Sequence, residues 1–477
     1  MNRLAMWITV AFGATLAGIA TGGVAAAPPA EADGGVQTAL VPVLNAGDRV
    51  LRFEWPALRI GTGEYEEGPT GLTVFHFPKR ARAAVDVRGG SPGTVNTDYL
   101  LQGYPGPLLD AVVFSGGSAY GLEATTAVAS AMKDDGLRGG GWDNIGFAAG
   151  AIIYDLGDRR LNEIYPDKRL AQAAFRAART GVFPLGAQGA GRFAVNGRLF
   201  GCNVYSGQGG AFRQIGDLKI AAFVVVNALG VVTRRDGRVA ACYRAPTWPA
   251  ELRTTDLFAR FPATGRGEWP AVADEPRGNT TLSLVVTNRR LEPAQLQRLA
   301  AQVHTSMARA VQPFATEFDG DVLFAVSTGE LDTPANGFEA ISIDVLASEV
   351  MWDAVLASVP DQPPVAATTE SGFAPKPEEL RRVVGEYAFS RGVCLRIESD
   401  GSQLTALAVG AEPVYAIGRT ARTVLQPVAR SEFRVPGRYP LSLRFDAGGK
   451  VVVNPGHWQQ SGDRQPTCSS PPRAESR

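Results

Sequence analysis

The chain has 477 residues, of which 45% are hydrophobic and 20% charged, and 47 basic residues balance 47 acidic ones to a formal net charge of zero. This length exceeds one ordinary domain, and the composition is typical of a globular protein with a large core. The balanced charge excludes a positive field that would draw nucleic acid or anionic lipid to the surface, so we expect no nucleic-acid partner.

The N-terminus has the pattern of a secretory signal peptide. Arg3 precedes an apolar run from Leu4 to Ala20, and small residues lead to an A-x-A sequence at 30–32, with Val24-Ala25-Ala26 as a competing cleavage site. The run is short for a membrane anchor and glycine interrupts it. We therefore expect residues 1–32 to be removed, leaving a periplasmic or secreted protein with no membrane span.

Residues 33–359 are expected to form one domain in which strands and helices are mixed. Short apolar runs of strand length predict buried strands, and apolar residues at helical spacing with end signals predict helices. In chain order these segments are 111–114 (strand), 166–178 (helix), 220–226 (strand), 293–310 (helix) and 338–358 (helix). The pattern predicts an α/β sandwich.

A second, smaller domain is expected near the C-terminus. Residues 360–378 are rich in proline and threonine without apolar periodicity, which predicts a linker. Residues 379–460 contain short strand-like pieces between turn residues, which predicts a small all-β barrel or sandwich. The predicted strands are 393–397, 403–409, 413–417, 423–427, 440–445 and 450–453. The polar residues 461–477 predict a disordered tail.

Four cysteines fit an exported protein. Pairing within each domain favours Cys202–Cys242 and Cys394–Cys468, although four cysteines allow three pairings and buried free thiols remain an alternative. Their spacing matches no zinc motif.

The most informative stretch is Gly278-Asn279-Thr280-Thr281, a small turn that leads into a β-branched run. A threonine hydroxyl is a weak nucleophile without a base, and cutting the Asn279–Thr280 bond would free an α-amino group on the same residue. Such an amine has a pKa of about 7.7–8.0, so near neutral pH it can accept the hydroxyl proton. An ordinary loop entering a buried strand gives the same sequence pattern.

A second candidate feature is Asp319-Gly320-Asp321 at the mouth of a predicted strand. Residues two apart in an extended chain project to the same side, and two close carboxylates perturb each other's pKa. Such a pair can hold a cationic or proton-exchanging group such as an N-terminal threonine. A solvated turn remains an alternative. A calcium loop is disfavoured, because the further spaced oxygen ligands of such a loop are absent from this segment.

A serine hydrolase with a catalytic triad is disfavoured. Gly116-Gly117-Ser118-Ala119-Tyr120 follows a predicted strand, but Tyr120 stands where a nucleophile elbow requires glycine. The only histidines are His76, His304 and His457. So few candidate bases favour a nucleophile that needs no histidine. Ser118, at the start of a predicted helix, remains a candidate for lining a pocket.

Six motifs occur in an order that resembles one family. They are Val85–Thr94, Asp110–Ser118, Ala151–Leu156, Val225–Gly230, Gly278–Thr281 and Asp319–Asp321. Together they resemble the L-aminopeptidase/D-esterase family, which includes D-aminopeptidases, β-peptidyl aminopeptidases and nylon-oligomer hydrolases. The resemblance covers about 59–329, with an extension to 359 left open. It implies a four-layer αββα sandwich with N-terminal-nucleophile-like layering, made as an inactive precursor.

The resemblance also implies roles for individual residues. Thr280 would attack the Asn279 carbonyl, and water would open the resulting ester. Tyr154 and Asn227 would line the oxyanion region, where a phenol and a carboxamide are suitable donors. Asp319 and Asp321 match the acidic pair of the nylon-oligomer branch. No metal or organic cofactor is implied, and family members form homo-oligomers of cleaved subunits.

Two departures from the family lie near the expected pocket. Gly197-Arg198 stands where many relatives have Gly-Lys, and arginine keeps the charge but cannot exchange the proton. Ser206–Gly210 replaces a lysine-glycine-glycine stretch without its cation. Substrate preference therefore does not transfer from relatives, and the C-terminal β domain is an addition to the family plan.

The sequence thus predicts an exported, self-cleaving aminopeptidase or amidase that acts on short peptides or peptide-like amides through Thr280. One alternative is an acyltransferase of the ornithine acetyltransferase type, which shares the layering, although its Thr-Met-Leu signature differs from Thr280-Thr281-Leu282. The other is a non-catalytic envelope binding protein that keeps the fold unprocessed.

Overall fold

A computed structural model describes most of the chain beyond its N-terminal segment. The described residues are 40–101, 108–202, 204–242, 251–260, 279–332, 337–359, 372–435 and 441–468. The predicted signal peptide, 1–32, and residues 360–371 of the predicted linker lie outside them. No helix in these residues has the length and apolar character needed to cross a membrane.

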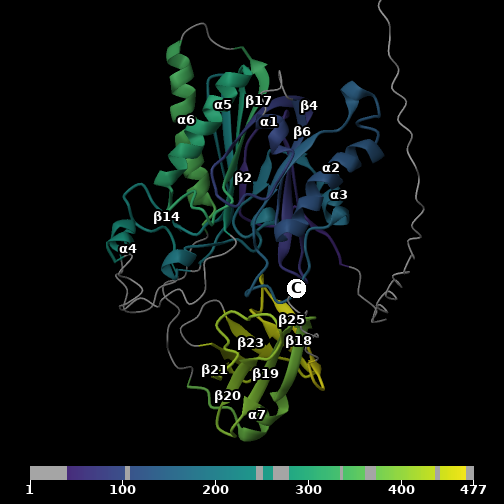
Figure 1. Cartoon of the computed structure of the whole chain (residues 1–477), viewed down its shortest axis with the longest axis vertical. Helices are drawn as coiled ribbons and strands as arrows, with labels where there is room; N and C mark the ends of the chain where they lie inside the picture. Colours follow the sequence, from purple (N-terminus) through teal and green to yellow (C-terminus); the bar gives the residue numbers. More distant parts are fainter. Residues whose placement is uncertain are drawn as a thin grey trace, which may run out of the picture. The chain divides into compact units, whose positions relative to one another are not determined.

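A mixed eleven-stranded sheet forms the first domain (Figure 1). Its main path has the order β12-β13-β15-β17-β4-β6-β7-β5, and β3 pairs with β4, β1 and β8 beside this path. The strands are β1 (Val43–Leu44), β3 (Arg59–Tyr65), β4 (Thr70–Val87), β5 (Thr94–Val95), β6 (Leu108–Ser115), β7 (Ala148–Ile152), β8 (Arg179–Thr180), β12 (Gly207–Ile215), β13 (Leu218–Asn227), β15 (Thr280–Arg289) and β17 (Val322–Leu331). The strands predicted at 111–114 and 220–226 are the buried centres of β6 and β13.

Shorter elements connect the sheet. They are β2 (Val50–Arg52), β9 (Val182–Pro184), β10 (Val195–Asn196), β11 (Val204–Tyr205), β14 (Val231–Val232), β16 (Val311–Gln312), α1 (Thr97–Leu101) and α4 (Thr254–Arg260). β2 pairs with β9, β10 with β11, and β14 with β16.

Four longer helices cover the sheet: α2 (Glu123–Asp134), α3 (Lys168–Arg176), α5 (Pro293–Ser306) and α6 (Gly337–Ala357). The last three confirm the predicted helices with small shifts of their ends. α3 begins at Lys168 because the Asp167 side chain accepts a hydrogen bond from Leu170 N–H and caps the helix. α5 has Pro293 at its start and a capping box formed by Glu292 and Gln295.

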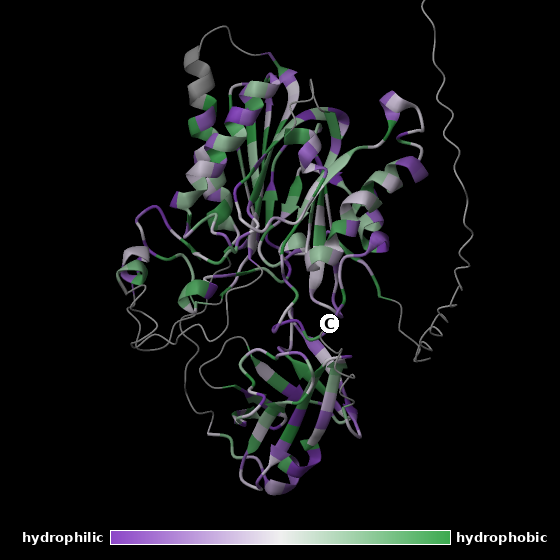
Figure 2. Ribbon diagram, in the orientation of Figure 1, coloured by the Kyte–Doolittle hydropathy of each residue, from purple (hydrophilic) through white to green (hydrophobic). Residues whose placement is uncertain are grey.

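Three large apolar cores hold the sheet and the four longer helices together. One core lies between α5, α6 and one face of β13, β15 and β17, and another lies between α2, α3 and strands β4, β6 and β7. The third core lies between the faces of the strands that point away from these helices. In it, Phe75 packs against Phe223 and Phe114 packs against Phe324. Figures 1 and 2 show the helix pairs on opposite sides of hydrophobic strands.

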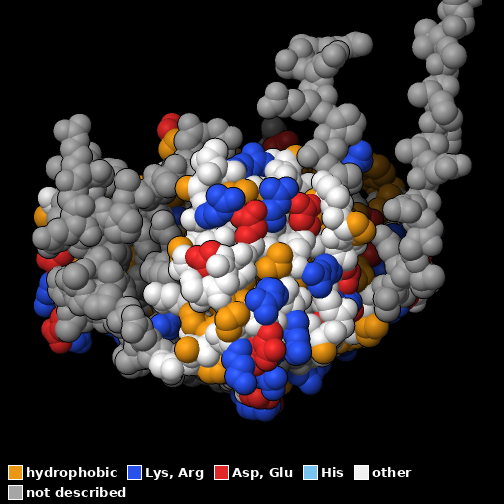
Figure 3. Space-filling model, turned by 90° about the horizontal axis from the view of Figure 1, so that it is seen from below, with side chains coloured by type: hydrophobic (Ala, Val, Ile, Leu, Met, Phe, Trp, Pro, Cys, Tyr) orange, Lys and Arg blue, Asp and Glu red, His pale blue; other side chains and the backbone are white. Residues whose placement is uncertain are grey.

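The C-terminal domain is a closed eight-stranded barrel. Of the two predicted all-β architectures, a barrel and a sandwich, the barrel is therefore confirmed. Its elements are α7 (Pro377–Val383), β18 (Gly385–Ser390), β19 (Val393–Ser399), β20 (Leu404–Ala408), β21 (Thr423–Ala429), β22 (Glu432–Arg434), β23 (Ser442–Phe445), β24 (Lys450–Val453) and β25 (Gln460–Gln465). On the face in Figure 3, acidic and basic side chains are interspersed, in keeping with the balanced charge.

Two predictions for this domain are wrong. Residues 413–417 form a turn with a single bridge between Val414 and Ile417, because Ala416 adopts a left-handed backbone with φ of 60°. The tail does not begin at residue 461, since β25 pairs with β18 and β24 and closes the barrel. Its polar sequence lacks the apolar alternation by which a strand is recognised.

Both favoured disulfides are present, one in each domain. Cys202 pairs with Cys242 and Cys394 with Cys468, and no cysteine is free. The second disulfide ties the chain after β25 to β19, which extends the ordered barrel to Cys468.

Candidate active site

The Asn279–Thr280 peptide lies at the start of β15, in the middle of the sheet. Thr280 is paired with Asn227 on β13, and both Asn279 and Thr280 are fully buried. The Thr280 hydroxyl donates to the Asn279 carbonyl oxygen at 2.5 Å, and the Gly320 N–H donates to the same oxygen at 2.9 Å. One carbonyl oxygen therefore receives two donors, one of them the candidate nucleophile.

Sheet topology brings the two candidate motifs together. β15 and β17 run parallel, so their N-terminal ends lie side by side, and Asn279 forms a bridge with Asp319. Asp319-Gly320-Asp321 leads into β17 just as Asn279 leads into β15. The predicted juxtaposition of a threonine and an acidic pair is thus a consequence of parallel pairing.

Each carboxylate of the acidic pair has its own hydrogen-bond donors. Asp321 accepts from Thr281 N–H at 2.5 Å and from Ala315 N–H at 3.0 Å. Asp319 accepts from Leu229 N–H at 3.2 Å, and its other oxygen accepts from the Thr316 N–H and hydroxyl at 3.1 and 2.7 Å. Both residues are 1% exposed, so the pair is held in fixed positions away from solvent.

Burial perturbs the titration of both carboxyls. Burial, followed by repulsion from Asp319, raises the pKa of Asp321 to about 8, although two backbone N–H groups oppose the shift. Burial also raises the pKa of Asp319. Near neutral pH the Asp321 carboxyl of the intact chain is therefore largely protonated.

This shift predicts how the stability of the intact chain depends on pH. The Asp321 carboxyl binds its proton more tightly in the folded state than in the unfolded state. Its contribution to the free energy of unfolding is therefore complete below its ordinary pKa of 3.8 and is lost as pH rises toward 8. In a Thr280→Ala chain, the free energy of unfolding should fall with pH by up to about 1.4 kcal/mol per unit. Adding Asp321→Asn should flatten this slope in urea titrations between about pH 5 and 8. Equal slopes in the chains with and without Asp321→Asn would show that Asp321 does not cause the pH dependence.

The glycine-rich segment after β4 forms a wall of the site. Arg88 and Gly89 donate N–H groups to the Asp321 carbonyl oxygen, and Ser91 donates to that of Asp319. A β-carbon on Gly89 would lie 2.2 Å from the Asp321 nitrogen, so this close backbone approach requires glycine. The first family motif therefore holds the acidic turn in place.

Asn227 and Tyr154 are also connected at the site. Asn227 donates from its side-chain nitrogen to the Tyr154 carbonyl at 3.0 Å and accepts from Val195 N–H at 3.0 Å. The Tyr154 hydroxyl lies near Gly93, where an added β-carbon would be 3.6 Å away. Asn227 therefore lies beside Thr280 and fixes two neighbouring segments.

Ser118 and Arg198 contact the segment that follows Tyr154. The Ser118 hydroxyl accepts from Leu156 N–H at 3.1 Å. Arg198 lies 3.9 Å from a carboxylate oxygen of Asp158, which makes a long ion pair. Both predicted pocket residues thus contact the 154–158 segment, while Asn279, Thr280, Asp319, Asp321 and Asn227 meet by direct strand pairing or hydrogen bonds.

The three histidines have partners in other parts of the molecule. His304 lies 2.8 Å from Asp86, His457 bonds the Ala187 carbonyl, and His76 packs against Phe175. The site is therefore built from hydroxyl, carboxyl, amide and backbone groups. Sequence reasoning missed one of these groups, the Gly320 N–H, since a backbone donor has no side-chain signature.

A hydroxyl next to a carbonyl, with an acid pair and backbone donors, is an arrangement suited to acyl chemistry without histidine. The chain belongs to peptidase family S58, whose model matches residues 56–367. The predicted resemblance to the L-aminopeptidase/D-esterase family is thereby confirmed. The match ends before β18, so the barrel lies outside it.

Relatives carry the names of amide hydrolases. The chain is 41% identical over 327 residues to a 6-aminohexanoate-oligomer endohydrolase of Paenarthrobacter ureafaciens, covering 66% of this chain and 88% of that protein. It is 32% identical over 315 residues to an uncharacterized aminopeptidase of Mycobacterium bovis, covering 62% and 87%. Among solved structures, a Burkholderia β-aminopeptidase is 19% identical with a TM-score of 0.46, covering 66% of this chain and 88% of that one.

Proposed function

We propose that this protein is an exported, self-cleaving amidase, most simply an aminopeptidase on short peptides or peptide-like amides, with Thr280 as its nucleophile. The observation that carries the proposal is the contact of the Thr280 hydroxyl with the Asn279 carbonyl, which Gly320 also binds. Membership of a peptidase family supports amide hydrolysis, and the same membership supports a four-layer αββα arrangement.

These contacts support self-cleavage by the following steps. The Thr280 oxygen bonds to the Asn279 carbonyl carbon, and the charge that develops on the carbonyl oxygen is stabilised by the Gly320 N–H. The carbon–nitrogen bond then breaks, the hydroxyl proton passes through the acidic pair to the Thr280 nitrogen, and an ester remains. Water opens this ester, which leaves an Asn279 carboxylate and a free Thr280 amine.

Turnover repeats the same steps on a substrate amide. The freed amine accepts the hydroxyl proton, the Thr280 oxygen attacks the substrate carbonyl, and the amine product leaves with the proton. Asp319 and Asp321 hold the amine, while Asn227 and Tyr154 complete the oxyanion region. Water then hydrolyses the acyl ester of Thr280.

Burial supports cleavage as an activation step. Asn279 and Thr280 are 0% exposed, so a substrate cannot reach the hydroxyl of the intact chain. The Asn279 side-chain amide is also buried, and both of its polar atoms lack a hydrogen-bond partner among the described residues. Each such group costs about 1–3 kcal/mol, which cleavage would relieve by freeing residue 279.

Gly320→Ala should slow self-cleavage strongly. The new β-carbon would lie 2.7 Å from both the Thr280 hydroxyl oxygen and the Ser91 carbonyl oxygen, so the nucleophile must move. A displacement of this size is expected to reduce the rate by about 100-fold, measured on denaturing gels after cell-free synthesis. Gly140→Ala is the matched control, because a β-carbon there meets nothing within 4 Å. Equal rates for both variants would show that the contact has no role.

The substrate class can be tested with a panel of amides. Relatives named as a 6-aminohexanoate-oligomer endohydrolase and as an aminopeptidase suggest two classes of amide, linear aminohexanoate oligomers and peptides with a free N-terminal amine. Purified protein should release amine product from L-, D- or β-amino-acid amides, or from aminohexanoate oligomers. Transfer of the acyl group to an added amine in preference to water would instead support the acyltransferase. Binding without turnover would support the envelope binding protein.

A further inference from the structure

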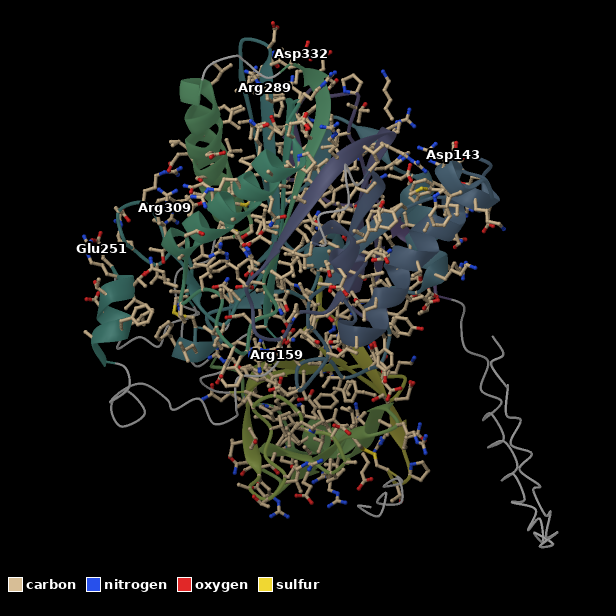
Figure 4. All side chains as sticks on the ribbon, turned by 45° about the horizontal axis from the view of Figure 1, so that its top comes forward. Asp143, Arg159, Glu251, Arg289, Arg309 and Asp332 are labelled. Carbon is tan, nitrogen blue, oxygen red and sulfur yellow. A yellow bond between two sulfur atoms is a disulfide. The ribbon has the colours of Figure 1, made fainter. Side chains whose placement is uncertain are left out.

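We propose that the C-terminal barrel is a positioning module, which holds the two segments that fix Asn227 beside Thr280. The first is the Tyr154 loop, residues 154–161, and the second is the β10–β11 pair. This role rests on the proposed function and concerns a domain outside the family match. Figures 1 and 4 show the barrel next to the end of the sheet domain where Arg159 lies.

The barrel binds the backbone of the Tyr154 loop. Gln460, 1% exposed, accepts from Leu161 N–H at 2.6 Å and donates to the Arg159 carbonyl at 2.8 Å, so one side chain satisfies both groups. Tyr415 donates its N–H to the Asp158 carbonyl at 2.9 Å. Three of the four loop positions from 158 to 161, all except Arg160, are thus fixed by barrel residues.

Side chains of the same loop enter the barrel. Leu161, 2% exposed, is part of the apolar core of the barrel. The Arg159 guanidinium lies 3.8 Å from the centre of the Tyr415 ring and 5.7 Å from that of Tyr205, so it is held by aromatic faces of both domains. The loop is therefore an integral part of the junction.

The barrel also binds next to the β10–β11 pair. Trp458 stacks on Tyr205 of β11, with ring centres 4.2 Å apart and planes 12° from parallel. Its indole N–H donates to the Arg192 carbonyl at 2.9 Å, and Arg192 donates to the His457 carbonyl at 2.9 Å. Tyr205 pairs with Val195 of β10, which transmits the contact to that strand.

Both contact regions meet at Asn227. Its side chain donates to the carbonyl of Tyr154, the first residue of the loop, and accepts from Val195 of β10. Asn227 is the strand partner of Thr280. Loosening either barrel contact should therefore let Asn227 move relative to the hydroxyl, which affects the chemical step more than substrate binding.

The position of the proposed cut adds a second consequence. The barrel and Thr280 belong to the C-terminal fragment, whereas the Tyr154 loop, β10 and β11 belong to the N-terminal fragment. Every barrel contact described above therefore joins the two fragments, and keeps the site assembled after the chain is cut.

The test uses full-length protein with Trp458→Ala, Trp458→Phe, Gln460→Leu and the control Trp142→Ala, whose ring is 91% exposed. Trp458→Ala and Gln460→Leu should lower kcat about 10-fold with KM within about 2-fold, and Trp458→Phe should restore kcat. Hydrogen exchange at the Val195 amide should be at least about 10-fold faster in Trp458→Ala than in the wild type and in the control.

The outcomes separate this proposal from the proposed function. If the wild type hydrolyses amides but Trp458→Ala and Gln460→Leu keep wild-type kcat and exchange, the positioning role is overturned. If the wild type shows no hydrolysis, the proposed function fails, and the exchange measurement alone decides whether the barrel holds β10. An equal loss in Trp142→Ala would also overturn the proposal, because that residue lies outside the junction.

Discussion

Thr280→Ala is expected to leave the chain uncut and to abolish hydrolysis. Without the hydroxyl no ester can form at Asn279, and no free amine arises to serve as base. We expect at least about a 10⁴-fold loss of amide turnover, as for removal of other nucleophiles. The measurement combines a denaturing gel with an assay of product amine on the same preparation.

Two further variants make this prediction specific. Thr280→Ser keeps a hydroxyl and should retain cleavage and measurable turnover. Thr287→Val changes a buried threonine farther along β15 and should be cut like the wild type. Full turnover by an uncut Thr280→Ala chain would exclude Thr280 as nucleophile.

Asp321→Asn is expected to produce the second largest effect. The acidic pair passes the hydroxyl proton to the departing nitrogen, and an amide cannot exchange that proton. The loss of proton transfer should reduce cleavage and turnover by about 10²–10⁴-fold. Because burial and repulsion from Asp319 raise the pKa of Asp321 to about 8, cleavage should slow as pH rises past that value.

The cleavage rate is measured as a function of pH on freshly synthesised chains. The control is Asp332→Asn, a carboxyl with an 87% exposed side chain at the end of β17. It should leave both rate and pH profile unchanged. A wild-type rate in Asp321→Asn would show that the acidic pair does not transfer the proton. The Gly320 contact with the Asn279 carbonyl would then be the remaining support for the mechanism.

The sequence predicted the main elements because their signals are local. The apolar runs inside β6 and β13 and the end signals of α3 and α5 depend on neighbouring residues, so they could be read along the chain. The cysteine pairing followed from domain organisation. The segment at 413–417 was misread because its composition suits a strand, while the left-handed backbone at Ala416 has no sequence signal.

The site could be predicted in its residues but not in its contacts. Thr280, Asp319 and Asp321 stand out by their chemistry, and the family motifs add Asn227 and Tyr154. The parallel pairing of β15 and β17, which places Gly320 on the Asn279 carbonyl, depends on strand order and has no local signal. The barrel contacts of Gln460 and Trp458 also join distant segments, so they required the structure.

Intact-mass measurement and N-terminal sequencing of active, purified protein test the central claim most directly. Two fragments are expected, one ending at Asn279 and the other beginning with a free Thr280 amine, and they should remain associated under native conditions. A single chain with the 279–280 bond intact and full amidase activity would contradict it.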